Sequence, residues 1–117
     1  MTHYTGGCQC GATKFTVDAD LSAPLMCNCS RCRRLGWAMA FVPETAFHLT
    51  ATGPLSEYLF NKQAIRHKFC TTCGIEAFAY SPAPDGTPMV AVNINCLDGV
   101  DTHAIAKAAK VFDGASV

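Results

Sequence analysis

The chain has 117 residues, half of them hydrophobic, and its nine basic and nine acidic side chains give a formal net charge of zero. This length fits one domain with a modest core, so we predict a single domain over residues 1–117. The balanced charge argues against a general polyanion binder, because such proteins carry a strongly basic face, and we expect no nucleic-acid partner.

Short β-strand signals separated by turn residues run through most of the chain. Apolar residues alternate with polar ones around Phe15, and the alternation is cleanest in the segment that ends at Cys96. Many short strands at this spacing are typical of an antiparallel, mainly β domain. In chain order, the expected strands cover residues 13–17, 37–42, 47–50, 57–60, 65–69, 75–80 and 89–96.

One short helix is expected near the C-terminal end of the sequence. Asp101 or Thr102 can cap a segment that runs through Lys110, and apolar residues recur in this segment at helical spacing. Gly114 follows and would stop the helix. The fold class predicted from pattern alone is therefore mainly β with one C-terminal helix.

The sequence also carries information about the compartment. Its longest aliphatic and aromatic run, residues 37–42, is far too short to cross a bilayer. The start, Met1 to Tyr4, lacks the basic and apolar regions of a signal peptide. We therefore expect a cytoplasmic protein with no membrane partner, and in a reducing compartment clustered thiols bind metal more often than they pair.

Eight cysteines are the outstanding feature of the composition. Two close pairs lie far apart in the sequence: Cys8 with Cys10, and Cys70 with Cys73. Zinc prefers four soft ligands in a tetrahedron, so two such loops predict a closed structural zinc site. Buried free cysteines and disulfides are the alternatives, but cysteines one residue apart make poor disulfide geometry.

A third cluster places Cys27, Cys29 and Cys32 within six residues. Three protein ligands and one open position are typical of a catalytic zinc, which can bind and activate a substrate. Two alternatives stay open: a fourth ligand from a histidine, an aspartate or Cys96, or a thiol cluster without metal. Cys96 itself is expected to be a small core residue, with a pocket thiol as its alternative.

Basic residues crowd this triple-cysteine loop. Arg31 and Arg33 could tune a negatively charged zinc site or bind the carboxylates of a small anionic ligand. A solvated basic loop is an equally good interpretation. The histidines show no ligand-like spacing and are expected to be surface or half-buried residues. They are His3, His48, His67 and His103.

These motifs resemble the glutathione-dependent formaldehyde-activating enzyme family, and the resemblance extends over nearly the whole chain. It rests on Gly6 to Gly11 (GGCQCG), Cys27 to Arg33 (CNCSRCR), Phe69 to Gly74 (FCTTCG), Val92 to Gly99 (VNINCLDG) and Phe112 to Gly114. The resemblance implies a tent-like, antiparallel β fold with zinc knuckles. It also implies a structural zinc on the first and last cysteine pairs, and a labile zinc on the middle cluster.

The resemblance further implies the chemistry. Family members add the thiol of glutathione to formaldehyde and form S-hydroxymethylglutathione, a carbon–sulfur lyase reaction in the reverse sense. The catalytic residues would be Cys27, Cys29 and Cys32. The resemblance assigns no role to the arginines, but their charge makes Arg31 and Arg33 candidates for binding a glutathione carboxylate. We therefore predict a zinc-dependent lyase-like enzyme that takes a small thiol substrate and acts as a monomer or homodimer.

Two other classes of function remain open at this point. One is a non-catalytic zinc-binding module that carries glutathione or docks a partner. The other is a redox or metal-buffering thiol protein, in which the triple cluster is oxidised or exchanges zinc.

Overall fold

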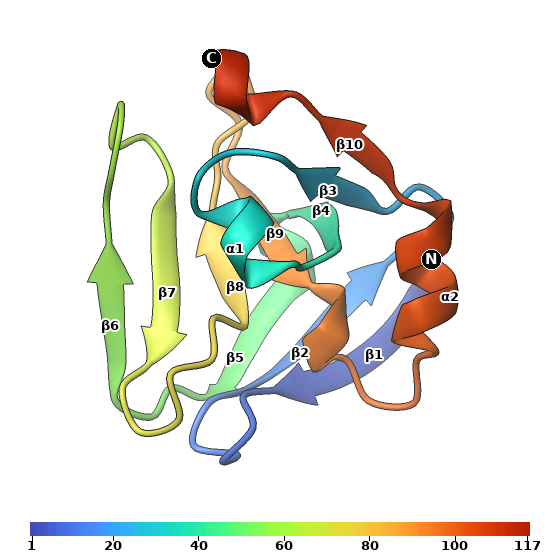
Figure 1. The fold of residues 1–117 in the computed structure, drawn as a ribbon. Helices are drawn as coiled ribbons and strands as arrows, with labels where there is room; N and C mark the ends of the chain where they lie inside the picture. Colours follow the sequence, from blue (N-terminus) through green and yellow to red (C-terminus); the bar gives the residue numbers. More distant parts are fainter.

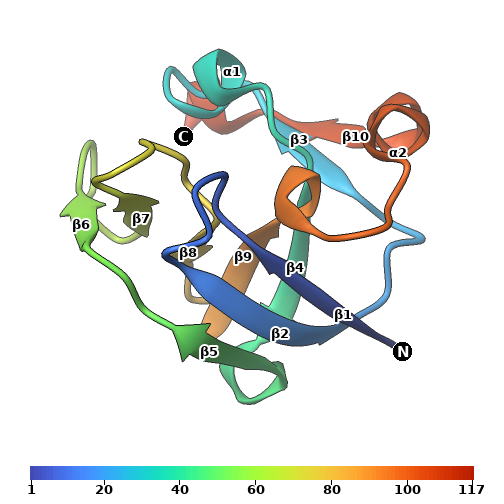
Figure 2. The same ribbon diagram turned by 90° about the horizontal axis from the view of Figure 1, so that it is seen from below.

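Two β-sheets form the framework of the computed structural model, which describes residues 1–117 (Figures 1 and 2). The smaller sheet has the order β1 (Thr2–Gly7), β2 (Lys14–Ala19) and β5 (Phe47–Ala51). The larger sheet has the order β10 (Lys110–Phe112), β3 (Leu25–Cys27), β4 (Met39–Pro43), β9 (Met89–Asn93), β8 (Phe78–Tyr80), β7 (Arg66–Cys70) and β6 (Leu55–Tyr58).

The helices are short. Helix α1 (Cys32–Leu35) follows the triple-cysteine loop, and α2 (Thr102–Ala108) lies near the C-terminal end. The side chain of Asp101 accepts a hydrogen bond from the backbone N–H of Ala104, which caps the start of α2. Single 3-10 turns cover Glu44–Ala46, Ile94–Cys96 and Gly114–Ser116. Neither helix has the length and apolar character that crossing a membrane requires.

The main core lies where the two sheets face each other. Strand β2 contributes Phe15, which packs against Phe47 of β5 with ring centroids 5.1 Å apart. Phe47 in turn meets Phe78 of β8 at 4.8 Å. The larger sheet adds Val90 and Val92, both fully buried. These residues are the inward members of the alternating segments, so period-two patterning explains the core directly.

The opposite face of the larger sheet carries a second, smaller cluster. It contains Trp37, Met39, Ala79, Ala91 and Cys32. Because successive side chains of a strand point to opposite faces, the strands that supply the core also supply this cluster. The second cluster is therefore built on the face of the larger sheet opposite the main core.

The mainly β, antiparallel fold with one C-terminal helix is confirmed, although several boundaries differ. The final predicted strand ends at Asn93 and not at Cys96, because the Asn93 side chain accepts a hydrogen bond from the Asn95 N–H and the chain turns. The predicted helix ends at Ala108, since Lys110 begins strand β10. That strand pairs in parallel with β3, which the sequence pattern did not predict.

We expect Phe78→Ala to destabilise the fold by about 3–5 kcal/mol, because the side chain is completely buried between Phe47 and Tyr80. Phe41→Ala is the matched control, since Phe41 is 42% exposed on strand β4 of the same sheet and its loss should cost about 1 kcal/mol or less. Urea unfolding measures both. Equal losses for the two variants would contradict the assigned core.

Candidate metal centres

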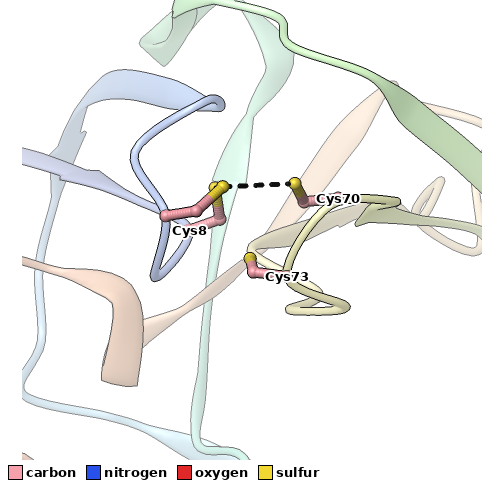
Figure 3. Close-up of side chains that lie close together, drawn as sticks. Cys8, Cys70 and Cys73 are labelled. Carbon is pink, nitrogen blue, oxygen red and sulfur yellow. Dashed lines mark hydrogen bonds between the residues drawn. The ribbon is translucent and has the colours of Figure 1, made fainter.

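The first and last cysteine pairs meet at one point. Cys8 and Cys10 lie in the turn between β1 and β2, and Cys70 and Cys73 lie at the end of β7 and in the turn that follows. The four sulfur atoms all lie within 4.8 Å of one another. Figure 3 shows Cys8 facing Cys70 and Cys73 across the space between the two turns.

The spacing of the sulfurs fits a tetrahedral zinc ion. The Cys8 and Cys10 sulfurs are 3.6 Å apart, and those of Cys10 and Cys70 are 3.7 Å apart. A tetrahedron with Zn–S bonds of about 2.3 Å has sulfur-to-sulfur edges of about 3.8 Å. A disulfide needs about 2.05 Å, and all eight cysteines are free thiols here. The donor set therefore fits zinc and argues against the disulfide alternative.

Both turns are shaped to present sulfur atoms. In the first, the Cys8 N–H donates to the Thr13 carbonyl at 3.1 Å, and the Thr13 N–H donates back to the Cys8 sulfur at 3.3 Å. In the second, the Gly74 N–H donates to the Cys70 carbonyl at 2.7 Å. Gly74 has φ +79°, a left-handed conformation that glycine adopts without strain.

The pKa values of these thiols also favour a shared cation. Burial raises the pKa of Cys8, but the Thr13 N–H and the neighbouring thiols outweigh it and lower the pKa to about 6. For Cys10, the Ala12 backbone N–H lowers the pKa, whereas burial and the neighbouring thiols raise it to about 11. Four adjacent thiolates repel one another, so the four thiols do not all ionise on their own. A bound divalent cation offsets this repulsion and favours the thiolate form.

The second cluster has three sulfurs. Cys27 ends β3, Cys29 lies in the loop, and Cys32 begins α1. Their sulfurs lie within 4.8 Å of one another, and no further thiol, imidazole or carboxylate joins them at that distance. Backbone N–H groups point at two of them, from Cys29 to the Cys27 sulfur at 3.4 Å and from Cys32 to the Cys29 sulfur at 3.3 Å. These donors stabilise thiolates, so the set fits a zinc ion with one open coordination position.

Hydrogen bonds and close packing hold the C-terminal segment against this cluster. Asn28 donates from its side chain to Asp113 at 3.1 Å, and its side-chain oxygen accepts from the Ala115 N–H at 2.9 Å. Gly114 packs so tightly that a methyl group there would collide with the Cys27 sulfur and would lie 3.3 Å from the Cys29 Cβ. Glycine is therefore required at this position by close packing against the cluster.

A cavity of about 580 Å³ opens beside the three sulfurs. Its volume falls within the range of small-molecule sites. Apolar side chains from the second core cluster, including Trp37 and Met39, form part of its lining, together with His67. Residues 60–65, residues 81–84 and the C-terminal segment complete the wall.

Arg31, which the sequence offered as a ligand-binding or tuning residue, has partners within the protein. Its guanidinium donates to Glu76 Oε1 from Nε at 3.0 Å and from Nη2 at 2.6 Å, and it lies over the Tyr58 ring at 4.7 Å. Arg33 is exposed. Arg31 is therefore held by partners within the protein, whereas Arg33, two residues later, is exposed.

His67 corrects one expectation. It was expected at the surface or half-buried, but it is 2% exposed, and its Nδ1 lies 2.7 Å from Glu76 Oε2. Sequence reasoning did not single out Glu76, which is also 2% exposed. The inward position of His67 in the alternating strand Arg66–Cys70 was the available signal, because Arg66 is exposed and Lys68 half-buried on either side of it.

Cys96 belongs to neither cluster, although, in addition to burial, Cys8 and Cys73 are near enough to help raise the pKa of its thiol. It packs half-buried against the main core at the end of a 3-10 turn and does not line the cavity. Burial raises the pKa of its thiol to about 12, so it is a neutral thiol at physiological pH. It is therefore not the fourth member of the triple cluster.

The comparison with known families decides the assignment. The family model described as glutathione-dependent formaldehyde-activating enzyme matches residues 3–114. The chain belongs to this family. A crystal structure of a Rhodobacter sphaeroides protein has the same fold, with a TM-score of 0.82 and 26% sequence identity over 92% of this chain and 99% of that one.

We expect the family's cysteine arrangement to bind two zinc ions per chain, and the two sites to be separable by mutation. Cys8→Ser should lose one zinc and destabilise the fold, because that site joins β1–β2 to β7. Cys29→Ser should lose the other zinc and remain folded. Metal analysis and thermal unfolding measure both effects, with Cys96→Ser as the control that keeps two. Loss of both metals from Cys29→Ser alone would contradict separable sites.

Gly114→Ala should weaken the second site by about 10–100-fold, the size of effect that groups packed around metal ligands have on metal affinity. The added methyl displaces the Cys27 sulfur. A competition titration with a chelator measures the affinity. Ala115→Ser is the matched control because residue 115 is exposed. Unchanged affinity in Gly114→Ala would show that the C-terminal segment is not packed on this cluster.

Proposed function

We propose that the protein is a zinc-dependent, carbon–sulfur lyase-like enzyme that acts on a glutathione–aldehyde adduct of the S-hydroxymethylglutathione type. The observation that carries this proposal is the triple-cysteine cluster at the side of the cavity, with three sulfurs and no fourth protein ligand. Membership of the family supports glutathione and formaldehyde as reactants.

Cys27, Cys29 and Cys32 would hold the metal. A zinc ion there lowers the pKa of a bound thiol, which supplies the nucleophilic sulfur that attack on an aldehyde requires. The protein's part is to keep the three sulfurs in place. The two N–H···S contacts and the packing of Gly114 hold the sulfurs of Cys27 and Cys29, and Cys32 is fixed by its place at the start of α1.

The reaction balances without an oxidant or reductant. A C–S bond forms between the glutathione sulfur and the aldehyde carbon, and the proton of the thiol ends on the aldehyde oxygen. In the lyase direction the same C–S bond breaks, the hydroxyl loses its proton, and the thiol regains one. The apolar lining near the cluster, such as Trp37 and Met39, excludes water from the reacting atoms.

The carboxylates of glutathione need cationic partners. Arg31 already gives two of its donors to Glu76, whereas Arg33 is exposed on α1 and does not line the cavity. Lys62 lines the cavity. We therefore favour Lys62 for carboxylate binding within the cavity, Arg33 for a carboxylate that extends beyond it, and Arg31 for holding the triple-cysteine loop.

Turnover of S-hydroxymethylglutathione tests the proposal. We expect the wild type to accelerate both formation and breakdown of the adduct, and Cys29→Ser to lose about 100-fold or more in kcat/KM, because the variant lacks one metal ligand. Cys96→Ser is the control and should keep wild-type activity. Glutathione binding without turnover in the wild type would identify a non-catalytic carrier. Full activity in Cys29→Ser would overturn the assigned site.

A further inference from the structure

Two buried side-chain nitrogens lack a hydrogen-bond partner in the protein, Trp37 Nε1 and His67 Nε2, and both residues line the same cavity. Leaving such a group unpaired destabilises the folded protein, so native proteins seldom do it without a reason. The Trp37 N–H lies close enough to Cys32 to lower its thiol pKa against the dominant effect of burial, but it makes no hydrogen bond there. His67 Nε2 has no such neighbour.

The other nitrogen of His67 is firmly held. Nδ1 lies 2.7 Å from Glu76 Oε2, while Arg31 donates to Glu76 Oε1 from two nitrogens. The side chains of His67 and Glu76 are 2% and 1% exposed. An ionised carboxylate only accepts hydrogen bonds, so the proton of the neutral imidazole sits on Nδ1. Nε2 is therefore left as a proton acceptor.

The cross-strand register places His67 in a row of cavity-lining residues, two of which have small side chains. His67 lies opposite Ala79, Ala79 opposite Ala91, and Ala91 opposite Phe41. All four residues line the cavity, and the two central ones carry only a methyl group. Larger residues in this row would fill the floor of the cavity. The small side chains keep His67 and the three cysteine sulfurs in one continuous space.

His67 is not itself a member of the metal cluster. The ligand atoms that lie within 4.8 Å of one another there are the three sulfurs alone. A substrate that extends from the three sulfurs toward β7 would contact both the cysteine cluster and His67. In the adduct, the atom next to the carbon–sulfur bond that needs a proton acceptor is the hydroxyl oxygen.

We propose that His67, oriented by Glu76 and Arg31, is the acid–base residue for the aldehyde-derived oxygen of the adduct. The inference rests on the proposed function. In adduct breakdown, Nε2 accepts the hydroxyl proton as the C=O bond forms, the C–S bond breaks, and its electron pair goes to sulfur. The proton then passes to that sulfur. In adduct formation, the proton released by the thiol first passes to Nε2, which then donates it to the carbonyl oxygen as the C–S bond forms.

The groups that surround His67 define the expected pH dependence. Glu76 and Arg31 face it, Tyr58 lies opposite it on β6, and the Phe60 ring lies 5.4 Å from the imidazole. Lys62 and the three cysteine thiols line the same cavity. Exchanging His67 should therefore change the pH profile of kcat for adduct breakdown, because the exchange removes the proton acceptor.

His67→Gln tests the assignment in the zinc-loaded protein. We expect kcat for adduct breakdown to fall about 100-fold or more, with KM changed little and the pH profile of kcat altered. Zinc content should remain that of the wild type. His48→Gln is the matched control, because His48 is exposed on β5, and it should leave kcat and the pH profile unchanged. An active wild type with kcat and its pH profile retained in His67→Gln would overturn this inference alone.

Glu76→Gln gives a second, independent variant in case His67→Gln fails to fold. A glutamine cannot stabilise the imidazolium, so we expect a loss in kcat of about 10-fold or more, with KM changed little and the pH profile of kcat altered. Unchanged kinetics in this variant would contradict the role of the Arg31–Glu76–His67 chain. A wild type without any adduct turnover would overturn the proposed function and this inference together.

A spectroscopic readout does not depend on rates. In protein with nitrogen-labelled histidine, the ring-nitrogen NMR signals of His67 should shift when glutathione and formaldehyde are added together. They should shift little with glutathione alone, because only the adduct carries the hydroxyl. Identical spectra in the two conditions would contradict contact between Nε2 and the aldehyde-derived oxygen.

Discussion

The buried carboxylate of Glu76 joins the parts of the molecule that carry its chemistry. It lies three residues after Cys73 of the four-cysteine site, and it binds Arg31, which lies between Cys29 and Cys32 of the other site. Its second oxygen holds His67. A buried charge is tolerated only when its partners are present, and breaking such a pair costs about 3–5 kcal/mol. This requirement fixes the triple-cysteine loop relative to the larger sheet.

The larger sheet serves two purposes through its alternating side chains. One face presents large apolar residues such as Phe78 and Val92 to the smaller sheet, and this packing stabilises the fold. The other face presents small residues such as Ala79 and Ala91, and the space that they leave becomes part of the cavity. The four-cysteine cluster at the end of β7 then joins the smaller sheet to this arrangement, so metal binding and folding are coupled.

Sequence reasoning found what is encoded locally. Cysteine spacing within a turn indicates metal ligands, and the clusters assemble as predicted for Cys8 with Cys70 and for Cys27 with its neighbours. Period-two patterning predicted most strands, but it missed β1, β3 and β10. Three residues are too few to show a period in β3 and β10, and β1 is polar and rich in glycine, so it shows no apolar alternation. The Glu76–His67 pair could not be read from the sequence, because its meaning depends on burial and on an arginine 45 residues away.

The central claim is that one site is closed by four sulfurs while the other keeps an exchangeable position. Zinc K-edge X-ray absorption of the fully loaded protein tests it most directly, because the spectrum reports the mean number of sulfur neighbours per zinc at about 2.3 Å. We predict a mean between three and four sulfurs that rises to about four when glutathione is added. A mean of four before glutathione, or a mean that glutathione leaves unchanged, would contradict an open thiol-binding position.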